Sequence, residues 1–265
     1  MRDFIDGDTM RGWRAARCRM LSMIGTDCPM CGGRSAGGAP CAPCLRDVVA
    51  TMHPDQPRCP RCALRLRAAQ TPCPDCARRP WPLAGVTAGF DYESPGDMLI
   101  THYKVQRRYA LAEPLADLIL RAPAMPRERD GQPGLPADTV LVPIPSARAS
   151  LRRRGFSPAA ELARAIAHRT GRPVQSRWLA RGREGPKQST LTRRARLHLA
   201  PDAYVCPASI PACTIALVDD VMTTGSTLHA AALALRAAGA VSIIGLVAAR
   251  APADDGGVLA QYRLP

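Results

Sequence analysis

The stretch ALVDDVMTTGSTL occupies residues 216–228 and joins two segments of different hydrophobic pattern. Residues 214–218 form a continuous apolar run, which predicts a buried strand. Residues 226–238 are rich in Ala and Leu and are followed by Gly239, a pattern typical of a helix and its end. Two acids, Asp219 and Asp220, come directly after the predicted strand, and small hydroxylic residues open the predicted helix. The sequence therefore predicts a strand–turn–helix unit.

The chain from residue 81 to residue 250 repeats this alternation. Further strands are predicted at residues 85–92, 139–142, 173–179 and 241–248, and helices at residues 97–121, as one or two helices around Pro114, and 156–170, ended by Gly171. Parallel neighbours need a crossover connection that is usually a helix. We therefore expect an α/β fold with a mostly parallel sheet covered by helices on both faces, and a ligand beyond the carboxyl ends of its strands.

The turn at residues 219–227 has the chemistry of a phosphate site. Successive backbone N–H groups, several hydroxyls and a helix N-terminus can surround a phosphate, and Gly225 allows a close approach or a positive φ. The loop holds no Lys, so it is not a G-x-x-x-x-G-K-[ST] nucleotide loop. Asp219 and Asp220 suit the two adjacent hydroxyls of a ribose and a nearby Mg²⁺. The residues together predict a clamp for ribose 5-phosphate, whereas the plain alternative is a polar turn without a ligand.

These residues resemble the thirteen-residue phosphoribosyl pyrophosphate (PRPP) signature of type I phosphoribosyltransferases. With the cysteine-rich segment before it, LVPIP at residues 141–145 and RRRGF at residues 152–156, residues 27–250 resemble the ComF family of competence-associated phosphoribosyltransferase-like proteins. The resemblance implies that the acids hold the ribose hydroxyls and that residues 223–227 hold the 5-phosphate. The implied PRPP-binding residues are Asp219, Asp220, Val221, Met222, Thr223, Thr224, Gly225, Ser226 and Thr227.

The resemblance also implies a pyrophosphate loop after the strand at residues 139–142. Its candidates are Pro145, Ser146, Arg148 and Arg152, with Arg153 and Arg154 beside them. Residues 180–200, which include Lys187, Ser189, Arg193 and Arg194, take the place of a flexible hood over the site. The chain departs from the family pattern at Ser146-Ala-Arg148, where a Leu-His-Pro-like run is common, and at Ser157-Pro158, where Asn-Gln is common.

Eight of the eleven cysteines form four Cys-x-x-Cys pairs. The third and fourth pairs repeat the first and second at an offset of 31 or 32 residues, so two similar units lie in tandem. Two tight turns of this kind can present four thiolates tetrahedrally, which predicts two structural zinc sites with sequential rather than cross-braced pairing. Iron–sulfur clusters and thioredoxin-like redox chemistry are the alternatives. The ligands are Cys28, Cys31, Cys41, Cys44, Cys59, Cys62, Cys73 and Cys76.

Composition changes divide the chain into four parts. These are a polar lead-in at residues 1–26, a double zinc ribbon at 27–80, a phosphoribosyltransferase-like domain at 81–250 and a tail at 251–265. No run of about 18 apolar residues is present, and three Asp precede residue 9, so neither a membrane span nor a secretory signal is expected. We therefore expect a cytoplasmic protein that does not insert into membranes.

The net charge is +14, and residues 146–200 carry most of it, with thirteen Arg and one Lys against two Glu. Such a segment is either a solvated face in an Arg-biased sequence or an anion-binding surface. Phe156 and Trp178 are its two aromatic residues, which favours contact with a phosphate backbone over base readout.

Two functions follow as expectations. The ComF resemblance implies PRPP binding linked to DNA uptake, competence or DNA handling, with single-stranded DNA and competence or repair proteins as partners. The alternative is a metabolic phosphoribosyltransferase that releases pyrophosphate in transfer to an unknown base or amine and has no DNA role. Whether the chain turns PRPP over or only binds it stays open, because the same signature serves both.

Overall fold

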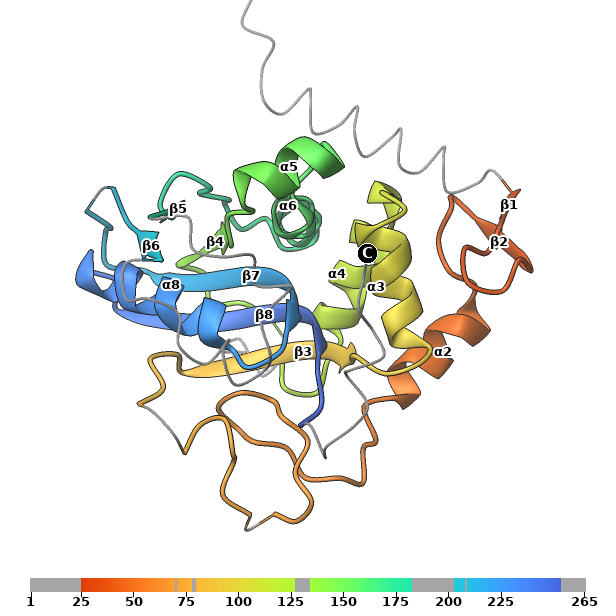
Figure 1. Cartoon of the computed structure of the whole chain (residues 1–265), viewed down its shortest axis with the longest axis horizontal. Helices are drawn as coiled ribbons and strands as arrows, with labels where there is room; N and C mark the ends of the chain where they lie inside the picture. The colour runs from red at the N-terminus through yellow and green to blue at the C-terminus, as the bar shows by residue number, and fades with distance from the viewer. Residues whose placement is uncertain are drawn as a thin grey trace, which may run out of the picture.

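The computed structural model describes residues 25–69, 71–77, 80–126, 134–182, 203–207 and 209–253. Its centre is a four-stranded parallel sheet of order β3-β8-β7-β4, labelled in Figure 1. The strands are β3 (Gly85–Asp91), β4 (Thr139–Pro143), β7 (Thr214–Met222) and β8 (Ser242–Arg250). The helices that accompany them are α3 (Gly96–Lys104), the 3-10 turn η1 (Tyr109–Leu111), α4 (Ala112–Leu120), α5 (Arg148–Arg154), α6 (Pro158–Thr170) and α8 (Ser226–Ala237). The predicted α/β fold with a parallel sheet is confirmed.

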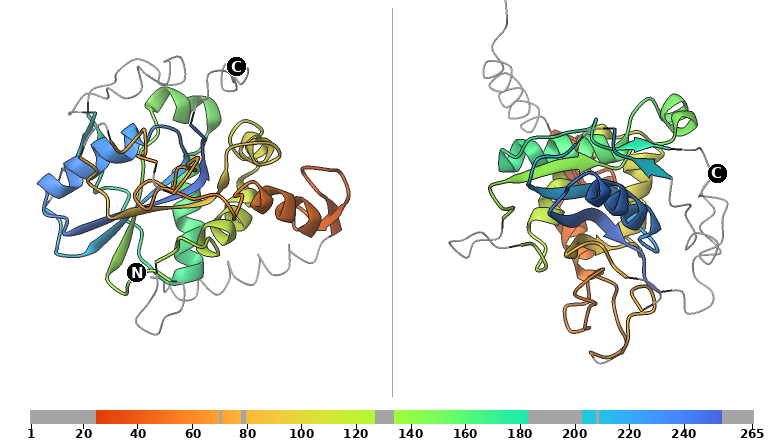
Figure 2. Two further views of the ribbon diagram at one scale, coloured as in Figure 1. Left: turned by 90° about the horizontal axis from the view of Figure 1, so that it is seen from below. Right: turned by 90° about the vertical axis from the view of Figure 1, so that its left-hand side faces the viewer.

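The sheet is buried on both faces because its strands are apolar at successive positions. In β7, Ile215 and Leu217 point into one apolar cluster, whereas Ala216 and Val218 point into another on the opposite face. The first cluster is completed by α8, and the second by α3, α4 and α6. Figure 2 shows the sheet between these two layers.

The register brings the carboxyl ends of the strands to one edge. Val218 of β7 pairs with Pro143 at the end of β4, and Met222 at the end of β7 pairs with Arg250 at the end of β8. Arg250 also pairs with Asp91, the last residue of β3. The turns after all four strands therefore meet at this edge, where ligands of parallel sheets bind.

Several element boundaries differ from the sequence predictions. β7 continues through Met222, so the acid pair lies within the strand rather than after it. The break between α3 and α4 falls at residues 105–108 and not at Pro114, which lies in the first turn of α4, where its missing N–H costs nothing. The prediction of a strand at residues 173–179 is wrong. The structure forms one isolated bridge there, between Val174 and Leu141.

Two short helices were not predicted. α2 (Ala42–Ala50) begins inside the second Cys-x-x-Cys pair and has Pro43 in its first turn. α5 follows the turn after β4 and ends at Gly155, which has a φ of 79°. The arginines at 152–154 thus occupy the end of a helix, where cations are favoured by the helix dipole.

The two cysteine units lie at different sides of the sheet domain. The first contains the antiparallel pair β1 (Gly25–Asp27) and β2 (Arg34–Ala36), followed by α2, which packs on β3 and α3. The loops of the second unit lie beside β3 and the end of β8 (Figure 1). Within the described residues, no helix is long and apolar enough to cross a membrane.

Candidate functional site

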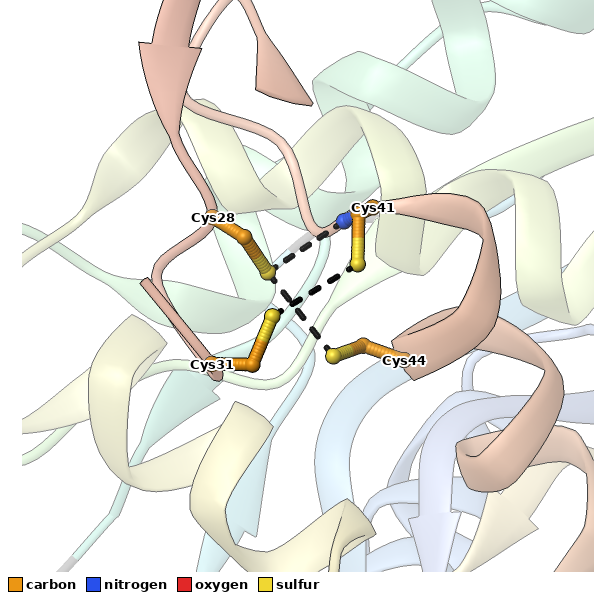
Figure 3. A group of neighbouring side chains, drawn as sticks. All are labelled: Cys28, Cys31, Cys41 and Cys44. Carbon is orange, nitrogen blue, oxygen red and sulfur yellow. Dashed lines mark hydrogen bonds between the residues drawn. The ribbon is translucent and has the colours of Figure 1, made fainter. Parts of the chain in front are cut away.

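The first cysteine cluster consists of Cys28, Cys31, Cys41 and Cys44, whose sulfur atoms all lie within 4.8 Å of one another (Figure 3). The Cys28 and Cys44 sulfurs are 3.8 Å apart, and those of Cys31 and Cys41 are 3.7 Å apart. A tetrahedron of Zn–S bonds of about 2.3 Å has edges of about 3.8 Å. The four thiols therefore already have the spacing that a zinc ion requires.

The second cysteine cluster consists of Cys59, Cys62, Cys73 and Cys76, and three of these residues are buried. The Cys59 and Cys76 sulfurs are 3.8 Å apart, and those of Cys62 and Cys73 are 3.5 Å apart. Each cluster combines two consecutive pairs, so the predicted sequential pairing is confirmed. Four sulfur ligands leave no open coordination position, which fits a structural zinc site rather than a catalytic one.

One thiol in each cluster is predisposed to ionise. At Cys62 a hydrogen bond from the Cys76 thiol, aided by the charge of Arg250 and opposed by burial, lowers the pKa to about 5. At Cys28 burial opposes ionisation, but backbone N–H groups, led by that of Cys41, outweigh it and lower the pKa to about 6. Thiolates are the form that binds metal, so Cys28 and Cys62 are the thiols best suited to bind a metal first at neutral pH.

The predicted phosphate loop, residues 223–227, forms a compact turn between β7 and α8. Gly225 has a φ of 74°, in the left-handed region, and its carbonyl accepts the amide of His229 in the first turn of α8. The Thr224 and Ser226 hydroxyls are buried and lie 2.8 Å apart. The structure thus places buried hydroxyls and a helix start together at the carboxyl end of β7.

The acid pair has an unpredicted partner, Lys104, at the end of α3. The Lys104 ammonium lies 2.6 Å from a carboxylate oxygen of Asp220, whose side chain is buried. Burial would raise the pKa of Asp220, but the charge of Lys104 and its hydrogen bond outweigh burial and hold this pKa below its usual value. At Asp219, burial and then the charge of Asp220 raise the pKa well above the usual range.

No sequence signal near residues 216–228 pointed to Lys104, which lies more than one hundred residues earlier. One available clue is its rarity, since Lys104 and Lys187 are the two lysines of the chain. Tyr103 beside it is buried and donates a hydrogen bond to the Pro158 carbonyl, which anchors the end of α3 to α6. This contact fixes the backbone from which Lys104 reaches the acid.

The pyrophosphate-loop candidates are only partly brought to the site. Pro145 and Ser146 lie in the turn after β4, at the same edge as the acid pair, and the Ser146 hydroxyl is 3.1 Å from the Ser157 hydroxyl. Arg148 and Arg152 are exposed on α5. Arg154 is half-buried instead, and it interacts electrostatically with Asp220 while burial lowers its pKa.

Most of the predicted hood, residues 180–200, lies outside the described residues, which include its first three residues, 180–182, and resume after it at residue 203. There β5 (Ala180–Arg181) pairs antiparallel with β6 (Tyr204–Val205). The Arg181 guanidinium lies 5.6 Å from the centre of the Tyr204 ring. Burial raises the pKa of Tyr204 to about 12, and the charge of Asp219 adds to this effect. The base of the hood segment is therefore a two-stranded ribbon near the acid pair.

Comparison with known proteins shows relatives over most of the chain. The chain is 32% identical to the DNA utilization protein YhgH of Salmonella typhi over 203 residues, which cover 77% of this chain and 86% of that protein. The protein of the same name from Escherichia coli strain K12 is 29% identical over 203 residues. Competence protein F of Haemophilus influenzae is 27% identical over 229 residues, or 84% of this chain and 96% of that protein.

No protein-family model matches the sequence. The matched regions nevertheless cover 86% of the YhgH protein of Salmonella typhi and 96% of competence protein F. The two cysteine clusters also fit the double zinc ribbon that the sequence predicted. On these grounds the chain belongs to the ComF family, alongside DNA utilization protein YhgH and competence protein F.

Proposed function

We propose that this protein binds PRPP, or another ligand that contains ribose 5-phosphate, together with Mg²⁺ at the turn between β7 and α8. We propose further that it is a cytoplasmic protein of DNA uptake or DNA handling. The observation that carries the ligand proposal is the meeting of an acid pair, a hydroxyl-lined helix start and Lys104 at the carboxyl edge of the sheet. Two four-cysteine clusters with metal-ligand spacing suit a reducing compartment.

The phosphate loop supplies the 5-phosphate site in this proposal. α8 begins at Ser226, directly after its N-cap Gly225, and the positive end of the helix dipole favours an anion at the amides there. The hydroxyls of Thr224 and Ser226 lie close enough to one another to contact the same phosphate. Gly225 keeps the turn tight, because a Cβ at this position would lie 2.6 Å from Trp81 and from Met222.

The acid pair supplies the ribose and Mg²⁺ site. Lys104 neutralises Asp220 while the ligand is absent, and Mg²⁺ would replace this charge when the ligand binds. The displaced ammonium and the half-buried Arg154 would then face the pyrophosphate of PRPP, together with the turn at Pro145 and Ser146. The charge of Asp220 would then be neutralised by the Mg²⁺ of the ligand complex instead of by Lys104.

Binding is better supported than transfer. A transferase would displace pyrophosphate from the anomeric carbon through an oxocarbenium-like transition state, which needs positioning and charge stabilisation more than a covalent group. A metabolic phosphoribosyltransferase without a DNA role is the competing account. Pyrophosphate release with a small-molecule acceptor, in a protein that does not bind DNA, would favour it.

The DNA part of the proposal rests on a surface formed by α5 and residues 105–109. Arg107, Arg108, Arg152 and Arg153 are exposed there, and neither segment contains an acid. A hydrogen bond of 2.6 Å from the Arg107 guanidinium to the Arg153 carbonyl joins the two segments. Basic side chains that neutralise the phosphates of a nucleic acid release the counterions condensed on it, which favours binding.

Tyr109 adds an aromatic ring that the sequence pattern did not place in this basic region. Its side chain is 50% exposed, and its ring packs edge-on against Phe156 at 4.7 Å. An exposed ring among arginines suits the stacking of unpaired bases, which is the usual mode of binding single strands without sequence preference. We therefore infer that single-stranded DNA is bound on this surface.

The ligand proposal is tested by calorimetry with PRPP and Mg²⁺. Asp219→Asn combined with Asp220→Asn should lower the affinity by a factor of about one hundred or more, because each lost hydrogen bond to a charged group is worth about 1.5–3 kcal/mol. Asp117→Asn on α4, an acid paired with Arg169, is the matched control and should bind as the wild type does. Absence of heat and of a thermal shift with the wild type at millimolar ligand would refute the proposal.

The DNA proposal is tested by fluorescence anisotropy with a labelled single strand at several salt concentrations. Replacing Arg152 and Arg153 by Ala should weaken binding and reduce the salt slope by about 1.4, at about 0.7 for each phosphate contact. The control replaces Arg164 and Arg169, which form ion pairs with acids of α4 and α6, and removes the same charge. Equal losses in both variants would mean that net charge, not this surface, binds DNA.

A further inference from the structure

Arg250, the last residue of β8, is a fully buried cation. Its Nη2 lies 2.6 Å from the Asp75 carboxylate and 3.8 Å from the Cys62 sulfur, and its Nε donates to the Cys62 carbonyl at 2.9 Å. Its Nη1 donates to the carbonyls of Met222, Thr223 and Ala251. One side chain thus joins the second cysteine cluster to the start of the phosphate loop.

The guanidinium makes this link rigid. Burying a cation is costly unless its donors are paired, and here all three nitrogens have acceptors. The planar fork of Arg presents its donors in a fixed geometry. The distance between the turn at Cys62 and the backbone at Met222 and Thr223 is therefore set by the guanidinium.

Trp81 forms a second, independent link between the same two places. Its indole N–H donates to the carbonyl of Arg61, the residue before Cys62, at 3.1 Å. Its ring covers the phosphate loop at Gly225, so closely that a Cβ there would lie 2.6 Å from the ring. The turn at residues 59–62 is thereby connected to the start of the loop through Arg250 and to its middle, at Gly225, through Trp81.

The first cysteine cluster has different surroundings. The hydrogen bonds recorded for its thiols stay within residues 28–44. The helix that carries Cys44, α2, packs on β3 and α3. It therefore serves as an internal control for the second cluster.

We propose that the metal in the second cysteine cluster holds the phosphate loop in its ligand-binding form, with Arg250 as the positioning residue that transmits the metal state. Without metal, the turn at residues 59–62 loses the ligand bonds that fix it, and Arg250 and Trp81 lose their anchor. The loop then opens, and its affinity for a phosphorylated ligand falls. The inference rests on the proposed function only for the identity of that ligand.

Linkage makes the effect reciprocal. If zinc in the second cluster raises the affinity for the ligand, the ligand raises the affinity of that cluster for zinc by the same factor. The first cluster should show no such dependence. Binding of the phosphorylated ligand at a zinc-dependent site of this kind would therefore respond to the zinc supply of the cell.

The first experiment compares Cys76→Ser with Cys44→Ser by hydrogen–deuterium exchange, with zinc content measured on both proteins. Each variant should retain about one zinc per chain. We expect Cys76→Ser to raise amide exchange in residues 222–228 at least tenfold, and Cys44→Ser to leave it at the wild-type level. Equal exchange in the two variants would overturn the proposal.

The second experiment changes the link and leaves the cysteines in place. Arg250→Met should retain two zinc ions yet raise exchange in residues 222–228 and weaken ribose 5-phosphate binding at least tenfold. Arg250→Lys should restore part of both, and Asp75→Asn should give a smaller loss. A zinc-replete Arg250→Met protein with wild-type loop exchange would contradict the assignment.

The third experiment uses the unaltered protein, which removes the risk that a variant fails to fold. Zinc transfer to a chromogenic chelator is followed with and without ribose 5-phosphate and Mg²⁺. The ligand should slow the release of one of the two zinc ions at least fivefold, and equal slowing of both ions would overturn the proposal. If no phosphorylated ligand binds, the proposed function fails, while the exchange measurements still decide whether the second cluster controls the loop.

Discussion

Asp219 and Asp220 are neighbours in the sequence, but the fold gives their carboxyl groups different surroundings. The Lys104 ammonium lies 2.6 Å from the Asp220 carboxylate. At Asp219, burial and the negative charge of Asp220 raise the pKa instead. The first arrangement stabilises a carboxylate and the second disfavours one. Asp219 therefore keeps its proton to a higher pH than a free carboxyl group does, and a bound cation would compete with that proton.

This difference predicts a pH dependence of ligand binding. The pKa of Asp219 is raised, so Mg-PRPP should release a proton on binding, and its affinity should rise with pH from the usual Asp range up to the raised value. The groups that face Asp219 are Asp220, Lys104 and Tyr204. Calorimetry in two buffers of different ionisation enthalpy measures this proton, and identical heats in both buffers below neutral pH would contradict the account.

The same pKa has a consequence for stability without ligand. The folded state holds the Asp219 proton more tightly than the unfolded state does. The free energy of unfolding should therefore fall as pH rises from the usual Asp range to the raised pKa of Asp219. Asp219→Asn should remove this fall. Urea unfolding at several pH values checks it.

Gly225 provides a test of the loop at a single residue. Gly225 and Gly171 both have a positive φ near 70°, but a Cβ at Gly171 meets open space, whereas one at Gly225 would meet Trp81 and Met222. Gly171→Ala should cost about 1 kcal/mol from backbone strain alone. Gly225→Ala should cost more and should also abolish ligand binding, as measured by urea unfolding and calorimetry. If Gly225→Ala and Gly171→Ala lower the free energy of unfolding equally, Trp81 moves away from the new Cβ without a loss of stability.

At the scale of elements, β7 and α8 were predictable because one segment carries every signal they need. An apolar run, an acid pair, a glycine at a positive φ and an Ala-rich helix follow one another within 25 residues. Gly171 likewise ends α6 at a φ of 70°, as the pattern predicted. Local chemistry of this kind can be read without knowing the rest of the chain.

Other elements depend on tertiary contacts and escaped prediction. α5 is seven residues long with no buried residue, so it has no apolar periodicity to detect. The apolar residues at 174 and 179 suggested a strand, but Leu179 instead enters the core from an irregular segment. Lys104 could not be assigned to the acid pair because only the packing of α3 brings it there. The two cysteine clusters could be predicted without tertiary contacts, because the spacing of the Cys-x-x-Cys pairs alone indicates which cysteines belong together.

The first cysteine cluster gives a prediction at this scale. Cys41→Ser should lose one zinc ion and raise amide exchange in residues 25–50, because β1, β2 and α2 bury little apolar surface without it. The four strands of the central sheet should keep their protection. Loss of protection throughout the sheet would show that the first cluster supports the whole fold.

At the scale of the whole molecule, the second cysteine cluster is part of the main core rather than an appended module. Cys59, Cys62 and Cys76 belong to the same apolar cluster as Leu228 and Ile243 of the sheet domain. Elemental analysis should find two zinc ions per chain. Chelation should then lower the melting temperature of the central sheet as well as unfold the cysteine units, and an unchanged melting temperature after complete zinc removal would contradict this view.

The proposed ribose 5-phosphate site lies at the turn between β7 and α8. The most direct measurement is a crystal structure of the protein grown with PRPP and Mg²⁺. We expect density for the 5-phosphate against the amides of residues 224–227 and for the ribose hydroxyls at Asp219 and Asp220, with Lys104 moved off Asp220. A ligand bound elsewhere, or an unchanged Lys104–Asp220 pair with no density at the turn under saturating ligand, would contradict it.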